Sequence, residues 1–497
     1  MGPFLAFIWL AGFVGLIVML FLYLENEGYR NHYSSRYARY RDTLAWDKSA
    51  YAELQDRLCN ENPGVHNLRV FIGTWNVGDN APANDKLGEW IQKDYDIYAI
   101  SAQECAYPPR GHSTINKDWI AAIRAFFKQN GQRYKLVDTI DLREAIRLSV
   151  WIKADLRPLV SNVQRDKIAT KFPVLWRKGG TAIKFDFLST SMLFVNAHFT
   201  AHQHNITSRN NDAQMIMRKI RLGNKNFDMG NQFNYVFWCG DLNYRIEMDK
   251  EKALNLIDNA QWTDLEKHDQ LINQMRENNV LDSFVEQPIR FHPTYKWKRN
   301  KGDYDRKAPR VPAWCDRVLS KTLKGSYIKP IAYDAVTTML TSDHLAVWAG
   351  YEIQAENIFY SIGQDSHEYT IDFSTIEVNL NEKISYSKKN PKQEHVVICA
   401  PFLKETQSTC NPSNTITQDT SLTAITCRLT EQAISKQYLY LVVYRNTKES
   451  KTEILKGDAP LFLGDLVNKP NMSMSLDVYE GGLVVGSILV RATLTPI

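Results

Sequence analysis

The sequence predicts an α/β domain followed by an all-β domain, with an apolar segment in front of both. From about Leu68 to Ile353, short apolar runs alternate with longer amphipathic ones, as strands and helices do. After Gln354 the helical patterns stop and short alternating runs take over. Residues 3–24 carry no charge. We therefore expect an anchor at 1–25, a linker at 26–66, a large α/β domain at 67–353 and a β-sandwich at 354–497.

Composition and charge are those of an ordinary globular protein. The chain has 497 residues, of which 44% are hydrophobic and 23% are charged, enough for two or three domains. Its 60 basic and 55 acidic residues give a net charge of +5, an excess too small to indicate a nucleic-acid partner. The seven cysteines are scattered and include no CxxC pair, which is typical of reduced, cytosol-facing residues.

The N-terminal segment "PFLAFIWLAGFVGLIVMLFLYL" is long enough to cross a bilayer, which takes roughly 20 residues. A cleaved signal peptide would have a basic start and a small-residue cleavage site, and neither is present. Four arginines follow the segment and nothing basic precedes it. The positive-inside rule then predicts a single-pass membrane protein with its N-terminus outside and the rest of the chain in the cytosol.

The linker contains "YRNHYSSRYARYRD", a mixture of arginine and tyrosine suited to an interface with anionic lipid. A plain solvated linker is the alternative. Residues Thr43–Leu58 begin with a capping residue and have helical spacing, so we expect a short helix between anchor and body.

The α/β domain has six runs typical of buried strands and three typical of helices. The predicted strands are "RVFIGTW", "DIYAISAQE", "LSVWIK", "GTAIKFDFL", "SMLFVNAHF" and "YVFWCGD". The predicted helices are "DWIAAIRAFFKQ", "RNNDAQMIMRKIRL" and "EKALNLIDNAQWTDLEKHDQLINQM". In the C-terminal region "TIEVNLNE", "EHVVICAPF", "TAITCRLT", "YLYLVVYR", "MSMSLDVY" and "GSILVRATL" predict a β-sandwich without a catalytic constellation.

The stretch "YVFWCGDLNYR" ends a buried strand with two polar residues, Asp241 and Asn243. Because side chains alternate along a strand with period two, both are expected on the same face. Gly240 lets the backbone turn or lets another group approach closely. Asp and Asn are also ordinary turn residues after a strand, which is the alternative interpretation.

Similar polar residues follow other apolar runs of the domain. The full set is Asn76, Gln103, Glu104, Asn196, His198, His202, Asp241, Asn243, Asp316, Asp343 and His344. A cap, a turn or a buried histidine explains each residue taken singly. Six such segments in one domain instead indicate a site, because layered α/β folds assemble their sites at strand ends.

The residue types narrow the chemistry. A glutamate with asparagines and aspartates suits a hard cation such as Mg²⁺. The sequence has no HExxH motif, no cysteine and histidine spacing for zinc and no P-loop lysine. Histidines beside a metal, without a covalent nucleophile, indicate attack of water on a phosphate ester.

Nine blocks complete the pattern: "FIGTWNVG", "QE", "KGGTAIKF", "NAHFTAH", "RNND", "CGDLNYR", "FHPTYKW", "PAWCDRVL" and "SDHLAVW". In these blocks and their order, residues from about Leu68 to Ile353 resemble the inositol polyphosphate 5-phosphatases. That family belongs to the metal-dependent phosphoesterase superfamily that includes DNase I and apurinic endonucleases. The resemblance implies a four-layered α/β sandwich and Mg²⁺ as the cofactor.

The resemblance also implies roles for the metal and water. Glu104 is the main Mg²⁺ ligand, assisted by Asn76. Asp241 orients and deprotonates the attacking water. Asp343 lies beside the network of metal and water.

A second group of residues is implied to bind the phosphate. Asn243, Asn196 and His198 hold the scissile phosphate. His344 contacts the phosphate and is oriented by Asp316.

The block "FHPTYKW" resembles the one that reads the 4-phosphate of the inositol ring, which makes Tyr295 and Lys296 substrate-binding candidates. The family usually places a lysine and an arginine, one residue apart, before "PAWCDR". Arg310 fits this pattern, but Ala308 occupies the lysine position and Lys307 is displaced by one. Either Lys307 substitutes or the headgroup preference differs.

The expected function is that of a membrane-anchored phosphatase that removes the 5-phosphate of phosphatidylinositol 4,5-bisphosphate, 3,4,5-trisphosphate or both. One alternative is a soluble inositol polyphosphate 5-phosphatase or another phosphodiesterase of the superfamily. Another is a non-catalytic, membrane-tethered, lipid-binding adaptor. The C-terminal domain lies where family members carry SKICH, Ig-like or C2 modules, so we expect it to dock to membrane or protein, or to support the catalytic domain.

Overall fold

A computed structural model describes most of the chain after residue 63. The described residues are 58, 64–82, 86–106, 112–170, 177–224, 227–358, 366–381, 394–403, 407–408, 425–446 and 453–497. The expected membrane anchor and the linker helix lie outside these residues, apart from Leu58. Within the described part of the chain, no helix combines the length and apolarity needed to span a membrane.

Two six-stranded sheets form the catalytic domain. In hydrogen-bonded order, the first contains β11 (Ile328–Val336), β12 (Ala346–Ala355), β1 (His66–Asn76), β2 (Ile97–Gln103), β4 (Ile146–Lys153) and β3 (Tyr134–Leu142). The second contains β5 (Val160–Ala169), β6 (Gly179–Phe187), β7 (Thr190–His198), β8 (Tyr235–Asp241), β10 (Asp316–Thr322) and β9 (Val285–Glu286). The pairs β1–β2 and β7–β8 are parallel, so each needs a crossover, and a helix lies in each one.

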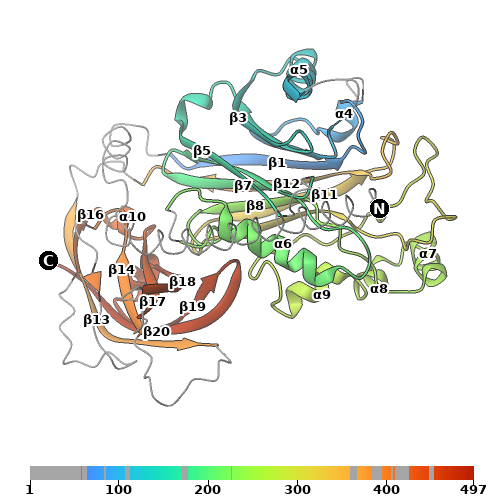
Figure 1. Cartoon of the computed structure of the whole chain (residues 1–497). Coiled ribbons are helices and arrows are strands. Elements are labelled where there is room, and N and C mark those ends of the chain that lie inside the picture. The colour runs from blue at the N-terminus through green and yellow to red at the C-terminus, as the bar shows by residue number, and fades with distance from the viewer. Residues whose placement is uncertain are drawn as a thin grey trace, which may run out of the picture.

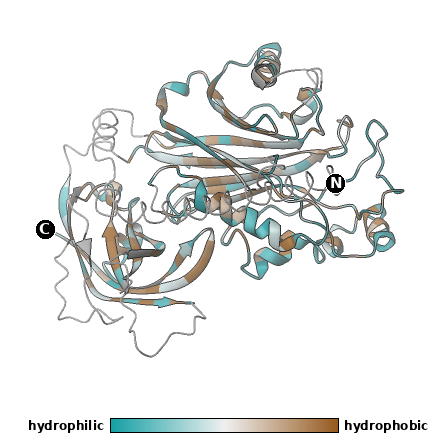
Figure 2. Cartoon of the chain, viewed as in Figure 1, coloured by the Kyte–Doolittle hydropathy of each residue, from teal (hydrophilic) through white to brown (hydrophobic). Residues whose placement is uncertain are grey.

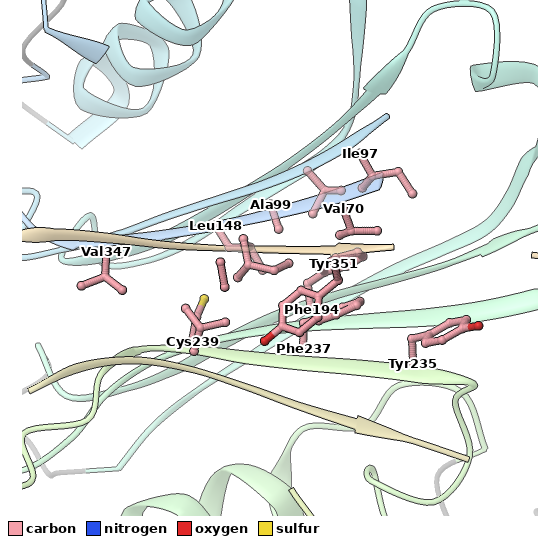
Figure 3. Close-up of a cluster of buried hydrophobic side chains, with 14 of the residues drawn as sticks. Val70, Ile97, Ala99, Leu148, Phe194, Tyr235, Phe237, Cys239, Val347 and Tyr351 are labelled. Atoms are coloured by element: carbon pink, nitrogen blue, oxygen red, sulfur yellow. The ribbon is translucent and has the colours of Figure 1, made fainter. Parts of the chain in front are cut away.

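The two sheets stack face to face around a shared core (Figure 1). Val70 and Ile97 of the first sheet face Phe194 and Phe237 of the second, and Figure 3 shows these side chains between the two layers. The rings of Phe194 and Phe237 stack with centroids 5.5 Å apart. Strands buried on both faces read as continuous apolar runs, which explains why the sequence predicted them.

Helices cover the outer faces. α4 (Leu87–Trp90) and α5 (His112–Gln129) pack on the first sheet, whereas α6 (Ile206–Lys219) and α9 (Gln270–Arg276) pack on the second. In Figure 2, α6 and α9 carry both the hydrophobic and the hydrophilic colour, as amphipathic helices do. The layers therefore run helix, sheet, sheet, helix, which confirms the predicted four-layered sandwich.

The long helical run expected at residues 251–275 is broken into three helices, so that prediction was wrong. The run forms α7 (Lys250–Asp258), α8 (Trp262–Glu266) and α9. Asp249 caps α7 by accepting from the backbone N–H of Glu251 and Lys252, and Asp269 caps α9 by accepting from Ile272. The cap at Asp249 precedes the run, whereas the cap at Asp269 starts a new helix inside an otherwise periodic sequence. A 3-10 turn, η1 (Arg157–Leu159), precedes β5.

The C-terminal region is an eight-stranded antiparallel sheet. Its order is β15 (Gln407–Ser408), β14 (Glu394–Cys399), β17 (Tyr438–Asn446), β18 (Glu453–Phe462), β19 (Asn471–Glu480), β20 (Leu483–Pro496), β13 (His367–Leu380) and β16 (Ile425–Leu429). β18 meets β19 at the pair Asp458 and Tyr479, and aliphatic residues from both halves share one core. Two short helices, α10 (Glu431–Ile434) and α11 (Leu463–Asn468), contradict the expectation that helices stop after Gln354.

The hairpin between β19 and β20 fastens the two domains together. Glu480 accepts three hydrogen bonds of 2.6–3.1 Å from Arg218 at the end of α6. Beside it lies an interface cluster of four buried residues, Asp228, Asn231, Lys321 and Asp458. The backbone N–H of Asp228 donates to Asp458 at 2.6 Å, and the Lys321 ammonium donates to Asn231 at 3.0 Å. The described C-terminal strands are therefore joined to the catalytic domain by buried polar contacts.

Candidate active site

Strand register brings the predicted residues together at one edge of the stacked sheets. Along β7, β8 and β10, His198 pairs with Asp241, and Asp241 pairs with Asp316. In the first sheet, Asn76 at the end of β1 pairs with Gln103 at the end of β2. Because the ends of neighbouring strands meet at the same edge, residues far apart in the sequence form one row.

Asp241 is the centre of the group and is almost fully buried. Its Oδ2 accepts a hydrogen bond of 2.9 Å from Asn76 Nδ2 and lies 3.1 Å from His198 Nε2. Burial alone raises the pKa of this carboxyl, but the charges of His344 and His198 outweigh burial and hold it well below its usual range. Asp241 is therefore an ionised acceptor at neutral pH.

Gly240 has the close approach expected of it. Its φ is +141°, and a Cβ added there would lie 1.9 Å from the carbonyl oxygen of Ala197. No other residue type fits at this point, because β7 and β8 touch through their backbones.

The strand alternation expected for Asn243 does not occur. β8 ends at Asp241, and Asn243 has a φ of +56°, so a left-handed turn rather than a strand brings it back beside Asp241. Its backbone N–H donates to Asp241 Oδ1 at 3.1 Å. Arg245 donates to Asn243 Oδ1 at 2.5 Å and to its carbonyl at 3.0 Å, which fixes the orientation of the amide.

His344 and Asp316 form a buried pair. His344 Nδ1 lies 2.8 Å from Asp316 Oδ2, which also accepts from Thr294 Oγ1 at 2.6 Å. The Tyr295 ring packs on the His344 ring with centroids 4.5 Å apart. Burial lowers the pKa of His344, but the charges of Asp316 and Asp241 raise it to about 9. The imidazole is therefore protonated at neutral pH.

Glu104 and Asn76 fit a hard cation. Glu104 follows β2 with a φ of +52°, and its carboxylate is one-third exposed, 3.8 Å from His198 Nε2. Asn76 Oδ1 accepts from the Gly78 N–H at 3.0 Å and retains a second lone pair. Few oxygen ligands beside solvent suit an ion that keeps its waters.

A second set of possible ligand atoms, on Asp241, Asp316 and His344, lies within 4.8 Å. In this set, Asp316 and His344 already contact each other at 2.8 Å, whereas the Glu104 carboxylate is one-third exposed. The assignment of the metal to Glu104 and Asn76 stays a prediction.

Two predicted residues lie apart from the centre. Asn196 is fully buried, with its Oδ1 accepting from Gln103 at 2.7 Å and its Nδ2 donating to the Arg147 carbonyl at 2.7 Å. Its Nδ2 also lies 3.5 Å from a second backbone carbonyl, so both donors face the backbone and the contact with phosphate stays a prediction. Asp343 lies at the rim, where it accepts from Arg299 at 3.0 Å, and its position relative to metal-bound water also stays a prediction.

The substrate-binding candidates lie on one loop beside His344. Arg310 donates to the hydroxyl of Tyr295, and Lys296 lies 3.9 Å from Asp305. Lys307 is exposed. Lys250 of α7 donates to the carbonyl of Ala308, the position where the family pattern has a lysine. Lys250 lies 58 residues from Ala308 in the sequence, so no local pattern predicted this contact.

Sequence reasoning also passed over two cations inside the site. Lys178 immediately precedes β6 and contacts His198 Nε2. Arg245 holds Asn243, as described above, and lies 4.7 Å from the Tyr295 ring centroid. The blocks "KGGTAIKF" and "CGDLNYR" contain both residues and were the available signal.

Comparisons with known proteins agree with this geometry. Residues 73–350 match the family model described as Endonuclease/Exonuclease/phosphatase family 2. The chain is 32% identical over 340 residues to phosphatidylinositol 3,4,5-trisphosphate 5-phosphatase 2A of Danio rerio, covering 62% of this chain and 26% of that protein. It is 30% identical over 347 residues to phosphatidylinositol 3,4,5-trisphosphate 5-phosphatase 1 of Homo sapiens, covering 63% and 28% respectively. The matched region thus spans about a quarter of these relatives.

A solved structure has a similar fold. It is the inositol polyphosphate 5-phosphatase domain of spSynaptojanin, in complex with inositol (1,4)-bisphosphate and a calcium ion. The two chains are 28% identical with a TM-score of 0.53, and the match covers 62% of this chain and 91% of that one. The similarity supports the four-layered fold described above.

Proposed function

We propose that this chain, which belongs to Endonuclease/Exonuclease/phosphatase family 2, hydrolyses the 5-phosphate of phosphoinositides. The observation that carries the proposal is the position of ionised Asp241. It lies between His198 and the pair formed by His344 and Asp316, at the same edge as the exposed Glu104 carboxylate. A base, cationic donors and oxygen ligands for a metal are the parts that hydrolysis of a phosphate monoester requires.

Asp241 prepares the water. An ionised carboxylate accepts a hydrogen bond from water and takes its proton as the new P–O bond forms. Asn76 donates to Asp241 Oδ2, and the Asn243 N–H donates to Oδ1, so the carboxylate is held in one orientation. A base that is already held in its reactive orientation does not need to reorient before each reaction.

His344 stabilises the phosphate. Its Nδ1 is held by Asp316, which leaves Nε2 as a charged donor toward a phosphate oxygen. His198 offers a second nitrogen at the same edge of the sheet. Donors fixed before the reaction stabilise the charge that develops on the phosphate oxygens.

We propose Mg²⁺ as the metal, held by Glu104 and Asn76, whose oxygens suit it. Bound there, it would neutralise part of the phosphate charge.

Phosphatidylinositol 4,5-bisphosphate and 3,4,5-trisphosphate are the proposed substrates. The relatives are named for the trisphosphate, and the similar structure contains inositol (1,4)-bisphosphate, which lacks a phosphate at position 5. Lys296 and Arg310 lie beside His344 on the loop that would face the 4-phosphate. Lys250, Lys307 or both would replace the lysine absent from position 308.

We further propose that residues 3–24 anchor the chain in a membrane, with the N-terminus outside and the catalytic domain in the cytosol. The uncharged stretch and the arginines after it support this arrangement. A tether raises the local concentration of a lipid substrate. Docking to membrane or protein is proposed for the C-terminal domain.

The test is phosphate release by the full chain from four short-chain substrates: phosphatidylinositol 4,5-bisphosphate, 3,4,5-trisphosphate, 3,5-bisphosphate and soluble inositol 1,4,5-trisphosphate. We expect release from the 4-phosphorylated lipids, its loss with EDTA, and recovery with Mg²⁺. Glu104→Gln should raise the Mg²⁺ concentration needed for half-maximal activity, whereas Glu251→Gln on the exposed start of α7 should not. No release from any substrate by folded protein would contradict the proposal.

A further inference from the structure

Lys178 is placed in the site by the pairing of β6 with β7. Gly179, the next residue, pairs with His198 in the antiparallel register, so Lys178 lies at the level of the strand ends. Its carbonyl accepts from the Thr170 N–H at 3.0 Å. Gly179 has a φ of +153°, and a Cβ there would lie 2.1 Å from the Ile168 carbonyl. The backbone therefore has little freedom to carry Lys178 elsewhere.

The Lys178 side chain is partly buried, and its ammonium differs from buried cations of the catalytic domain in having no oxygen acceptor in the part of the chain that the structure describes. Lys184 lies 3.3 Å from Asp186, and Lys321, which has no described carboxylate within 4.0 Å, donates to Asn231 at 3.0 Å. Within the described residues, the side-chain contact of Lys178 is His198 Nε2. A partly buried cation without an oxygen acceptor is costly, and a ligand that supplies the oxygens would remove this cost.

The charge required is that of an oxyanion. An ammonium group has three N–H donors and no acceptor, and at most one donor can be directed at His198. Burial lowers the pKa of Lys178, and the charges of Asp241 and Glu104, both outside ion-pair distance, only partly oppose this effect. A bound anion would favour the charged ammonium. A dianionic phosphate bound beside His198 would accept the unused donors.

We propose that Lys178 is a further catalytic residue whose ammonium binds a non-bridging oxygen of the scissile phosphate. This inference rests on the proposed function, since it names one more contact to the same phosphate. Negative charge on the non-bridging oxygens is what a fixed cation stabilises as the phosphoryl group passes to water.

Kinetics of two variants test the contact. Lys178→Met keeps the length of the side chain but removes its charge and donors, so kcat/KM should fall about 10²–10³-fold, the usual effect of losing one such donor. Lys178→Arg keeps the charge and should retain activity within about tenfold of wild type. Lys153→Met is the matched control, because Lys153 pairs with Asp96 at 2.6 Å at the other end of β4, and its kcat/KM should not change.

Two further measurements do not depend on turnover. Titration of metal-free protein with orthophosphate should give a Kd at least about tenfold higher for Lys178→Met than for wild type. Reductive methylation of the wild-type protein, followed by mass spectrometry, should show orthophosphate protecting Lys178, a result that needs no variant to fold.

The outcomes separate this inference from the proposed function. A wild-type chain that releases no phosphate, but whose orthophosphate binding needs Lys178, would refute the phosphatase and keep the phosphate contact. A wild-type chain that is active, with Lys178→Met within threefold of it and orthophosphate binding unchanged, would overturn the inference. Absence of protection in the methylation experiment would overturn it as well.

Discussion

Two buried polar clusters lie at opposite ends of the paired strands β8 and β10. One is the site cluster around Asp241, and the other is the interface cluster around Asp458, next to the C-terminal hairpin. Each contains two carboxylates and a cation removed from solvent. They differ in how completely their hydrogen bonds are satisfied.

The interface cluster is closed. Asp458 accepts from the Asp228 N–H at 2.6 Å and from Asn231 Nδ2 at 3.2 Å. The two oxygens of Asp228 accept from the N–H groups of Gly230 at 2.9 Å and Gly482 at 2.8 Å. Such a cluster has donors for its acceptors and joins two domains.

The site cluster is open. His198 Nδ1, Asp316 Oδ1 and Gln103 Oε1 are buried and have no hydrogen-bond partner among the described residues. Buried polar atoms are nearly always paired, and these three could be paired by substrate, water or metal. Other unpaired buried atoms lie elsewhere in the described chain, for example on Trp119, so unpaired atoms indicate a site only where ionisable groups also gather.

The largest effect is expected for Asp241. Asp241→Asn removes the base but keeps the shape, so kcat should fall about 10³-fold or more. The melting temperature should change little, because one carboxylate between two histidines is not required by the core. Paired assays of phosphate release and thermal unfolding check both halves. If Asp241→Asn lowered the melting temperature and kept its activity, the site cluster would be structural, like the interface cluster.

The pH dependence of activity tests the charge on His344. Its pKa is raised to about 9, so the imidazolium is present below that pH and activity should decline about tenfold per unit above it. Asp316→Asn removes the anion that raises this pKa, so the descending limb should move to lower pH. Profiles of kcat against pH for both proteins make the comparison. An unchanged limb in the variant would show that another group titrates there.

The interface cluster should respond in stability alone. Burial, with the nearby Asp228, raises the pKa of Asp458 to about 8, so its contribution to stability is full below about pH 4 and is lost progressively as the pH rises from about 4 to 8. The wild type should lose up to about 1.4 kcal/mol of unfolding free energy per pH unit in this window. Asp458→Asn should flatten that slope and leave kcat unchanged. Unfolding at a series of pH values measures it, and parallel slopes would contradict the assignment.

The smallest effect on stability is expected for an ion pair that is exposed to solvent. Lys267 lies 2.7 Å from Asp264 on α8, with side chains 66% and 49% exposed. Water screens such a pair, so Lys267→Ala should change the unfolding free energy by less than about 0.5 kcal/mol and leave kcat unchanged. Denaturant unfolding provides the measurement. A loss of unfolding free energy above about 1 kcal/mol would mean that this ion pair stabilises the fold even though it is exposed.

Much of the fold could be predicted because its strands are buried on both faces. "YVFWCGD" forms β8 residue for residue, and the alternation of strands and helices predicted buried strands with helices outside. The four layers were implied by the family resemblance. Half-exposed strands such as β5, with polar residues throughout, have no comparable signal. The cap at Asp269 lies inside a run with continuous helical periodicity, so the sequence did not reveal the start of α9.

The sequence predicted which residues form the site, but not how their side chains are arranged in space. The position of Asn243 depends on a left-handed turn, because the strand ends two residues earlier. Lys178 enters through the register of β6 with β7, and Lys250 through a contact between α7 and a distant loop. Pairings distant in sequence leave no local pattern, so only the folded chain reveals them.

Hydrolysis in ¹⁸O-labelled water tests the central claim most directly. A single turnover of phosphatidylinositol 3,4,5-trisphosphate by the full chain with Mg²⁺ should give phosphatidylinositol 3,4-bisphosphate and orthophosphate carrying one ¹⁸O. That result would show that water attacks phosphorus at the 5-position, as the placement of Asp241 requires. Label in the inositol hydroxyl, or loss of a phosphate from another position, would contradict the account.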